Sequence, residues 1–112
     1  MVVVTGANGF IGANLCRWFA QRGQEVIALR GLSERGWRLG RDWKGRTVRR
    51  DLCDPEAVRA FVKEVQPSYW LHCAAYGAYS QQQDVEKIYQ ICFNSLLYLV
   101  EALREVKGFQ AF

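Results

Sequence analysis

The stretch that decides the fold runs from residue 2 to residue 12 and reads VVVTGANGFIG. Its first four residues are β-branched at successive positions, which predicts a short strand buried on both faces. The glycines Gly6, Gly9 and Gly12 follow with G-x-x-G-x-x-G spacing, and a helical period begins at Phe10. The stretch therefore predicts a strand, a tight glycine-rich turn and a helix.

The rest of the chain alternates strand-like and helix-like segments. Further strands are expected at 25–30, 47–50 and 69–73, and helices at 10–22, 54–66 and from 84 up to Gly108. In the second helix Asp54 is an N-cap and Pro55 occupies the first position. The alternation predicts an α/β fold, a Rossmann-type doubly wound parallel sheet with helices on both faces.

The predicted sheet is short for this class of fold. Residues 1–112 form one dinucleotide-binding domain in this interpretation, truncated after the fourth strand and its helix, and 109–112 resemble the opening of a fifth strand. We expect the outer edge of the fourth strand and the apolar face of the last helix to lack neighbours. Such surfaces favour poor solubility or a homodimer.

Composition excludes several classes of protein. With 112 residues, 50% of them hydrophobic, the chain predicts one globular domain and no disordered tail. No apolar run approaches the length of a membrane span, and no leader precedes the first strand. Four cysteines without a C-x-x-C pair, and a lone His72, argue against a metal site. Buried free thiols in a reducing cytoplasm are the expectation.

The net charge of +4 is concentrated between Arg30 and Arg50, where eight basic residues accompany two acidic ones. Trp37 and Trp43 are interleaved with them. Three interpretations are open, in decreasing order of weight: a solvated connection, a site for a phosphate-bearing small ligand, and a nucleic-acid surface. Nucleic acid is therefore an unlikely partner.

The first turn has the chemistry of a diphosphate site. Gly6 allows a sharp turn, Gly9 lets the backbone approach a pyrophosphate, and Gly12 permits close packing of the helix. The first amides of the helix lack intrahelical acceptors and point at the phosphate with the positive end of the helix dipole behind them. The candidate residues are Gly6, Ala7, Asn8, Gly9, Phe10, Ile11 and Gly12.

TGANGFIG resembles the TGxxGxxG signature of the extended short-chain dehydrogenase/reductase family, the nucleotide-sugar epimerases and dehydratases. The segments 51–54 (DLCD), 71–75 (LHCAA) and 76–80 resemble its later motifs. The resemblance implies that Asp51 and Leu52 lie at the adenine, and that Ala74, Ala75 and Tyr76 lie along the path to the nicotinamide. A strand-end acid that answers Arg49 or Arg50 is the other interpretation of Asp51.

The choice between NAD and NADP depends on Arg30, which follows the second strand. An arginine there cannot accept a hydrogen bond from the ribose hydroxyl, but it suits a 2′-phosphate. Arg35 and Arg50 would add to that charge, whereas Glu34 would reverse it. The sequence slightly favours NADP over NAD.

The chain departs from the family where catalysis is concerned. None of its five tyrosines is followed four residues later by lysine, so we assign no catalytic residue. Cys92, Ser95 and Leu96 stand where the family carries Asn and Gly-Thr. We expect the cofactor-binding portion of an epimerase, dehydratase or reductase, which meets its nucleotide-sugar substrate only in a longer form. A non-catalytic NAD(P)-binding or redox-sensing module is the alternative.

Overall fold

Four parallel strands form one sheet in the computed structural model, which describes residues 1–32 and 37–112. The strands are β1 (Val2–Thr5), β2 (Val26–Arg30), β3 (Arg46–Arg49) and β4 (Tyr69–His72), in the order β3-β2-β1-β4. Val2 of β1 is aligned with Val26 of β2 and with Tyr69 of β4. The Rossmann-type α/β fold predicted from the sequence is confirmed.

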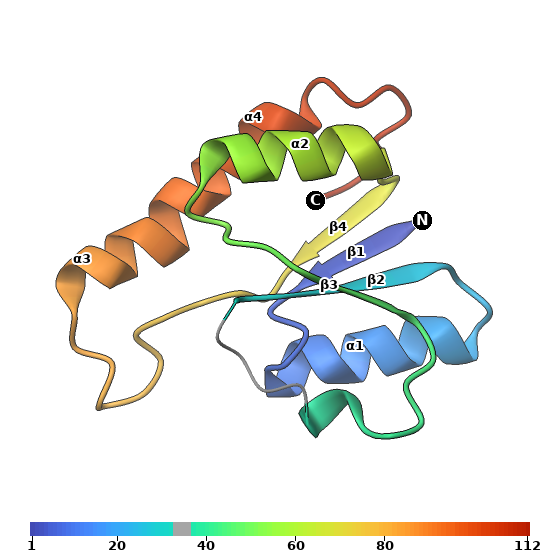
Figure 1. Ribbon diagram of the computed structural model, residues 1–112, viewed down its shortest axis with the longest axis horizontal. Coiled ribbons are helices and arrows are strands. Elements are labelled where there is room, and N and C mark those ends of the chain that lie inside the picture. Colours follow the sequence, from blue (N-terminus) through green and yellow to red (C-terminus); the bar gives the residue numbers. More distant parts are fainter. Residues whose placement is uncertain (33–36) are drawn as a thin grey trace.

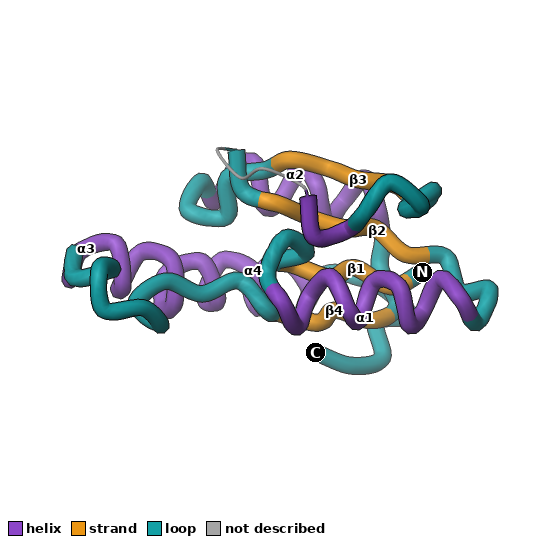
Figure 2. Tube along the Cα trace, turned by 90° about the horizontal axis from the view of Figure 1, so that it is seen from below, coloured by secondary structure: helices purple, strands orange, loops and turns teal. Residues whose placement is uncertain are grey.

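Helices cover both faces of this sheet (Figures 1 and 2). α1 (Phe10–Gln21) lies on one face, and α2 (Pro55–Val65) and α4 (Ser95–Leu103) lie on the other. Val2 and Val4 of β1 pack in the cluster beneath α1, and Val3 packs in the cluster beneath α2 and α4. The two-sided burial explains why the strand is apolar at successive positions.

Local capping fixes the start of α2. The Asp54 carboxylate accepts hydrogen bonds from the amides of Glu56 and Ala57 at 3.0 and 3.1 Å, and Pro55 is the first residue of the helix. Val58, Phe61, Val62 and Val65 are buried on the sheet, as their helical spacing predicts. The prediction of this helix and its N-cap is therefore confirmed.

The last helix differs from the prediction in continuity and length. It begins with α3 (Val85–Ile88), widens into the π-helix η2 (Tyr89–Asn94), and continues as α4 to Leu103. The helix predicted up to Gly108 therefore ends earlier, at Leu103. Val106 continues the apolar spacing of the helix and is buried, although it lies beyond the end of the helix. Its amide bonds to the Leu103 carbonyl at 3.1 Å, a three-residue turn, and Gly108 follows with φ of 88°.

The outer edge of β4 is partly covered, contrary to expectation. Ala111 forms a parallel bridge with Tyr69, and its carbonyl accepts from the Trp70 amide at 3.0 Å. The amide of Gln110 donates to the Ser68 carbonyl at 2.8 Å. The C-terminal residues therefore add to the sheet beside β4, as the opening of a fifth strand predicts.

Candidate dinucleotide-binding site

The carboxyl ends of the four strands lie along one edge of the sheet, because all the strands are parallel. The chain leaves β1 toward α1 on one face, whereas β4 leads to α3 and α4 toward the other face (Figure 1). In open α/β sheets, ligands bind in the crevice at such a switch point. The glycine turn and Ala74 to Tyr76 lie at the two sides of this point.

Gly6 occupies a position that no other residue fits. Its φ of 60° is left-handed, and a Cβ there would lie 2.4 Å from the carbonyl oxygen of Cys73 and 2.7 Å from the amide nitrogen of Ala74. The turn out of β1 thus touches the backbone that follows β4. The sharp turn predicted at Gly6 is confirmed, and the contact with β4 is an added constraint.

Gly12 lets α1 approach the same turn. A Cβ on Gly12 would lie 2.3 Å from the Gly6 carbonyl oxygen, and one on Gly9 would lie 3.1 Å from it. The close packing predicted for Gly12 is confirmed, with the turn as its neighbour. The Gly9 amide donates to the Gly6 carbonyl at 2.8 Å, which closes the turn.

The N-terminus of α1 is open. Gly9 is the N-cap residue, no side chain caps the helix, and its first turn carries no acidic residue. Phe10 and Ile11, the first two residues of the helix, are 76% and 65% exposed, whereas Gly12 and Ala13 are buried. Amides at this end have no intrahelical acceptor, and the helix dipole makes the end electropositive. This end of α1 can receive an anion.

Thr5 joins the ends of β1 and β4. Its hydroxyl oxygen is buried and accepts hydrogen bonds from the amides of Cys73 and Ala74 at 3.0 and 3.3 Å. The same oxygen lies 2.9 Å from Nδ1 of His72. A hydroxyl that accepts two bonds donates its proton in the third, so His72 accepts through Nδ1 and carries its proton on Nε2.

His72 is hydrogen-bonded and half-buried at the end of β4. Burial lowers its pKa from the ordinary value of 6.5, so the neutral ring that Thr5 needs is the favoured form. The ring also stacks on Phe112, with centroids 6.0 Å apart. His72 thus helps to fix the end of β4 beside the glycine turn. None of its contacts with the described residues suggests a catalytic role.

Tyr76 is held in place by a thiol from the π-helix. Sγ of Cys92 accepts a hydrogen bond from the Tyr76 amide at 3.4 Å and donates one to the Tyr76 carbonyl at 3.2 Å. Ser95 Oγ bonds to the Ile91 carbonyl at 2.6 Å where the π-helix ends. In the sequence, Cys92 and Ser95 stand out only as departures from the family, and their spacing gives no signal of this contact.

The remaining predicted residues lie at the ends of β2 and β3. Ala7 and Asn8 are buried, and the Ala7 amide donates to the Leu29 carbonyl at 3.3 Å, which ties the glycine turn to β2. Arg30 is 8% exposed. Asp51 is exposed and accepts from the Cys53 amide at 2.9 Å, and no ion pair links it to Arg49 or Arg50 in the described structure. Leu52 packs against the core cluster beneath α2.

Three arginines of the basic segment contact different parts of the molecule. Arg46 pairs with Glu64 at 2.7 Å, and the Arg50 guanidinium lies over the Phe61 ring. Arg38, on the short helix η1 (Trp37–Leu39), instead reaches the glycine turn, where its Nη1 donates to the Asn8 carbonyl at 3.3 Å. No pattern in the sequence separated Arg38 from its basic neighbours. Glu34 and Arg35 lie outside the described residues.

None of the four cysteines forms a disulfide bond, and only Cys16 is buried, so the expectation of buried thiols is correct for that residue alone. Burial raises the pKa of Cys16 to about 12. No group of three potential metal ligands occurs among the described residues. No described helix combines the length and apolarity needed to cross a lipid bilayer.

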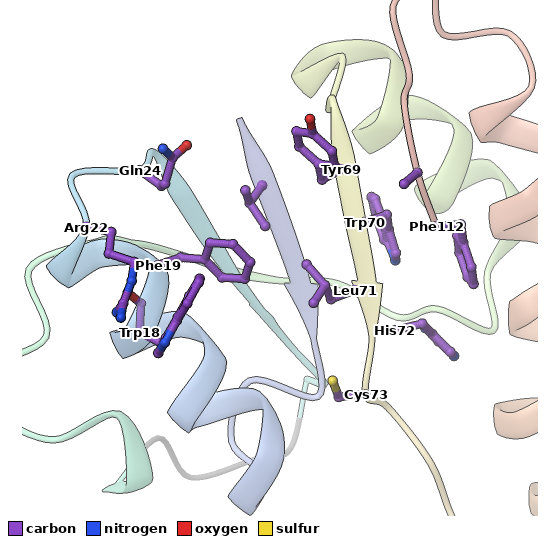
Figure 3. A pocket seen from close by; sticks show the side chains of 12 residues that line it. Trp18, Phe19, Arg22, Gln24, Tyr69, Trp70, Leu71, His72, Cys73 and Phe112 are labelled. Carbon is purple, nitrogen blue, oxygen red and sulfur yellow. The ribbon is translucent and has the colours of Figure 1, made fainter.

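A hollow of about 860 Å³ lies between α1 and β4 (Figure 3). Trp18 and Phe19 of α1 face β1 and β4, and Leu71 lies across from them. Its lining is chiefly aromatic and aliphatic, and it contains none of the glycines of the turn. This hollow is an uncovered apolar face of the sheet, and the anion-binding features lie at the carboxyl edge instead.

Solved structures of epimerases and of a dehydrogenase resemble this chain. A UDP-glucose 4-epimerase from Thermus thermophilus, in complex with NAD, has a TM-score of 0.80 and 29% identity over 94% of this chain. An epimerase from Methanothermobacter thermautotrophicus has a TM-score of 0.81 and 31% identity, also over 94%. An L-threonine dehydrogenase from Clostridium difficile shares the fold, with a TM-score of 0.83, 20% identity and 99% coverage. This chain spans about a third of each of these proteins (34%, 32% and 34%).

Among curated proteins, no sequence matches the chain. The sequence profile of the NAD dependent epimerase/dehydratase family, in contrast, matches residues 2–112, which include every motif described above. The fold agrees with that of the two epimerase structures, at TM-scores of 0.80 and 0.81. The chain therefore belongs to the NAD dependent epimerase/dehydratase family and corresponds to the N-terminal third of its solved members.

Proposed function

We propose that the chain binds a nicotinamide dinucleotide along the carboxyl edge of its sheet. The observation that carries this proposal is the open N-terminus of α1, set behind a turn with no room for a side chain at Gly6 or Gly12. A diphosphate needs such close access to backbone amides. Asp51 and Leu52 take the adenine side, and Ala74, Ala75 and Tyr76 take the nicotinamide side.

The wider activity we propose is that of a nucleotide-sugar epimerase, dehydratase or reductase. When bound, the nicotinamide supplies hydride exchange with a sugar carbon. The residues of this chain bind and orient the dinucleotide, and the Thr5 bonds to Cys73 and Ala74 keep the end of β4 beside the glycine turn. The residues that bind the sugar and transfer its proton would be supplied by a longer form of the protein.

One observation favours a second candidate function. Within these 112 residues no tyrosine has a lysine four positions later, and a non-catalytic NAD(P)-binding or redox-sensing module would need none. An assay of a longer form against UDP-glucose separates the two: turnover with a downstream Tyr-x-x-x-Lys supports the enzyme, and dinucleotide binding without turnover supports the module.

We also propose a preference for NADP over NAD. Arg30 supports this preference, because it ends β2 beside the glycine turn and carries no negative charge that would repel a 2′-phosphate.

A cytoplasmic location is a further proposal. Four cysteines without a disulfide bond fit this location, since the cytoplasm keeps thiols reduced.

A second copy of the chain is the protein partner we propose. Val85, Tyr89, Phe93, Leu97 and Val100 recur every three or four residues along α3, η2 and α4, and each is 42–63% exposed. An exposed apolar stripe of this length fits packing against the same stripe of a second copy. Sedimentation of wild type and Phe93→Glu tests this: a dimer that the variant dissociates supports it, and a wild-type monomer contradicts it.

Dinucleotide binding is tested by placing a negative charge at the end of α1. Ile11→Asp should weaken NADH binding at least tenfold, roughly 1.4 kcal/mol, because the carboxylate repels the diphosphate. The same charge suits the helix dipole, so the melting temperature should stay level or rise. Quenching of tryptophan fluorescence reports the binding.

Ile11→Asn is the matched control, because it has the same shape without the charge. It should keep most of the affinity. Equal loss in both variants would mean that the Ile11 side chain itself binds the ligand. No saturable binding of NADH or NADPH by folded wild-type chain would overturn the proposed function.

A further inference from the structure

A second hollow lies next to the glycine turn, and two arginines line it. Its volume is about 260 Å³, and α1 and η1 supply its walls. The lining residues are Phe10, Ala13, Asn14, Arg17, Trp37 and Arg38. The hollow therefore adjoins the proposed diphosphate site at the start of α1.

Arg38 is fixed at this place by its neighbours. Leu39, the next residue, is 4% exposed and anchors η1 in the core beside α1. The Arg17 guanidinium donates to the Arg38 carbonyl and, at 3.0 Å, to Oδ1 of Asn14. The Arg38 guanidinium lies 4.4 Å from the centre of the Trp37 ring, and its Nη1 bonds to the Asn8 carbonyl. The side chain is thus oriented toward the glycine turn.

The two guanidinium charges have no counter-ion in the described structure. The three ion pairs found there join other residues, and no carboxylate lies within 4 Å of Arg17 or Arg38. Arg38 spends one of its five N–H donors on the Asn8 carbonyl, which leaves a fork of donors for a ligand. Two uncompensated cations beside a diphosphate site favour a further anionic group.

A second polar group in the turn also lacks a partner. Asn8 is 7% exposed, and both its amide nitrogen and its amide oxygen are without a hydrogen bond among the described residues. Burial of an unsatisfied amide is unfavourable unless a ligand or water completes it. Asn8 is also the residue whose carbonyl Arg38 contacts. The Asn8 amide, which lacks hydrogen-bond partners, and the Arg38 guanidinium, which has unused donors, therefore lie close together.

We propose that Arg38, held by Arg17 and Trp37, binds the phosphate monoester on the adenosine ribose of NADP(H). This inference rests on the proposed function, because a dinucleotide on the glycine turn is what brings that phosphate to the hollow. It places the contact with this phosphate on Arg38 of η1, whereas Arg30 at the end of β2, a residue 8% exposed, contributes only by carrying no negative charge there.

The test compares NADPH and NADH on the full chain by tryptophan quenching. Wild type should bind NADPH about tenfold more tightly, as expected for a charge-assisted, forked contact. Arg38→Gln should reduce that ratio to about twofold or less. Arg38→Lys keeps the charge without the fork and should restore part of the preference.

Arg41→Gln is the matched control, because Arg41 is exposed in the same segment and no bond or ion pair of the described structure involves it. It should keep the wild-type ratio. Equal binding of NADH and NADPH by wild type, or an Arg38→Gln chain that keeps its preference, would overturn the assignment and leave dinucleotide binding intact. Binding of neither dinucleotide would overturn the proposed function and this inference together.

Discussion

Two connections leave neighbouring strands at the carboxyl edge of the sheet, and they are held in different ways. The turn after β1 packs backbone against backbone, with Gly6 against Cys73 and Gly12 against Gly6. The connection from β2 to β3 depends on side chains: Leu39 is buried, and the Trp43 indole donates to Thr47 Oγ1 at 3.0 Å. Close backbone packing therefore fixes the turn after β1, whereas a few side-chain contacts fix the connection from β2 to β3.

This difference matches the two tasks that we propose for them. Amides that receive a diphosphate must stay at fixed positions, and a backbone with no space to move provides that. A connection held by side chains can vary in sequence while its ends stay in place, so it can carry the residues that distinguish one dinucleotide from another. We expect substitutions in the two connections to have unequal effects.

The largest effect should follow Gly6→Ala. The new Cβ would lie 2.4 Å from a backbone oxygen of Cys73, and the φ of 60° is itself strained for alanine. We expect a loss of at least about 3 kcal/mol in the free energy of unfolding, from strain and overpacking combined. Urea denaturation followed by circular dichroism measures it.

Gly40→Ala is the matched control in the other connection. Its φ is 80°, yet nothing lies within 4 Å of the added Cβ. The expected loss is about 1 kcal/mol, from backbone strain alone. If both alanine variants lose the same stability, backbone crowding does not distinguish the two connections.

Leu39→Ala should have the next largest effect, because Leu39 anchors η1 beside α1. Removing a buried leucine side chain costs about 2–3 kcal/mol. Leu32→Ala, at a site 62% exposed, should stay within about 0.5 kcal/mol of wild type. Thermal denaturation of both variants gives the comparison, and a Leu39 effect no larger than the Leu32 effect would remove its role as an anchor.

The sequence predicted the backbone-packed region better than the region held by side chains. Residues 2–5 are buried on both faces of the sheet, and position 6 has no space for a Cβ. Both constraints can be recognised from the residue types alone, apolar in the strand and glycine in the turn. The parallel sheet, the turn and the N-cap of α2 follow from such local rules. The contact of Arg38 with Asn8 spans 30 residues, and no local pattern indicates it.

The π-helix is the second feature that local pattern could not predict. A run of apolar residues spaced three or four apart is equally compatible with an α-helix, and Cys92 meets Tyr76 only because the tertiary fold brings them together. Val106 shows the converse, since its burial continued the helical pattern beyond the end of the helix. Periodicity reports which residues are buried and not how the backbone reaches that burial.

The smallest effect that we predict concerns pH and the contact between the two sides of the glycine turn. Burial lowers the pKa of His72 below its unfolded value, so the folded state binds this proton less readily than the unfolded chain does. Stability should therefore be fully present above pH 6.5 and fall as the pH drops through the lower, folded-state pKa. Protonation would also turn Nδ1 into a donor and remove the acceptor of the Thr5 hydroxyl.

Because His72 is the chain's single histidine, its variant isolates this titration. Unfolding free energies of wild type and His72→Gln, measured at pH 8 and pH 5.5, should differ in slope, with wild type losing more on acidification. Carboxylates titrate in both proteins and cancel in the difference. Parallel slopes would show that the proton on His72 is not coupled to folding. The bonds of Thr5 to Cys73 and Ala74 would then hold the turn without help from the ring.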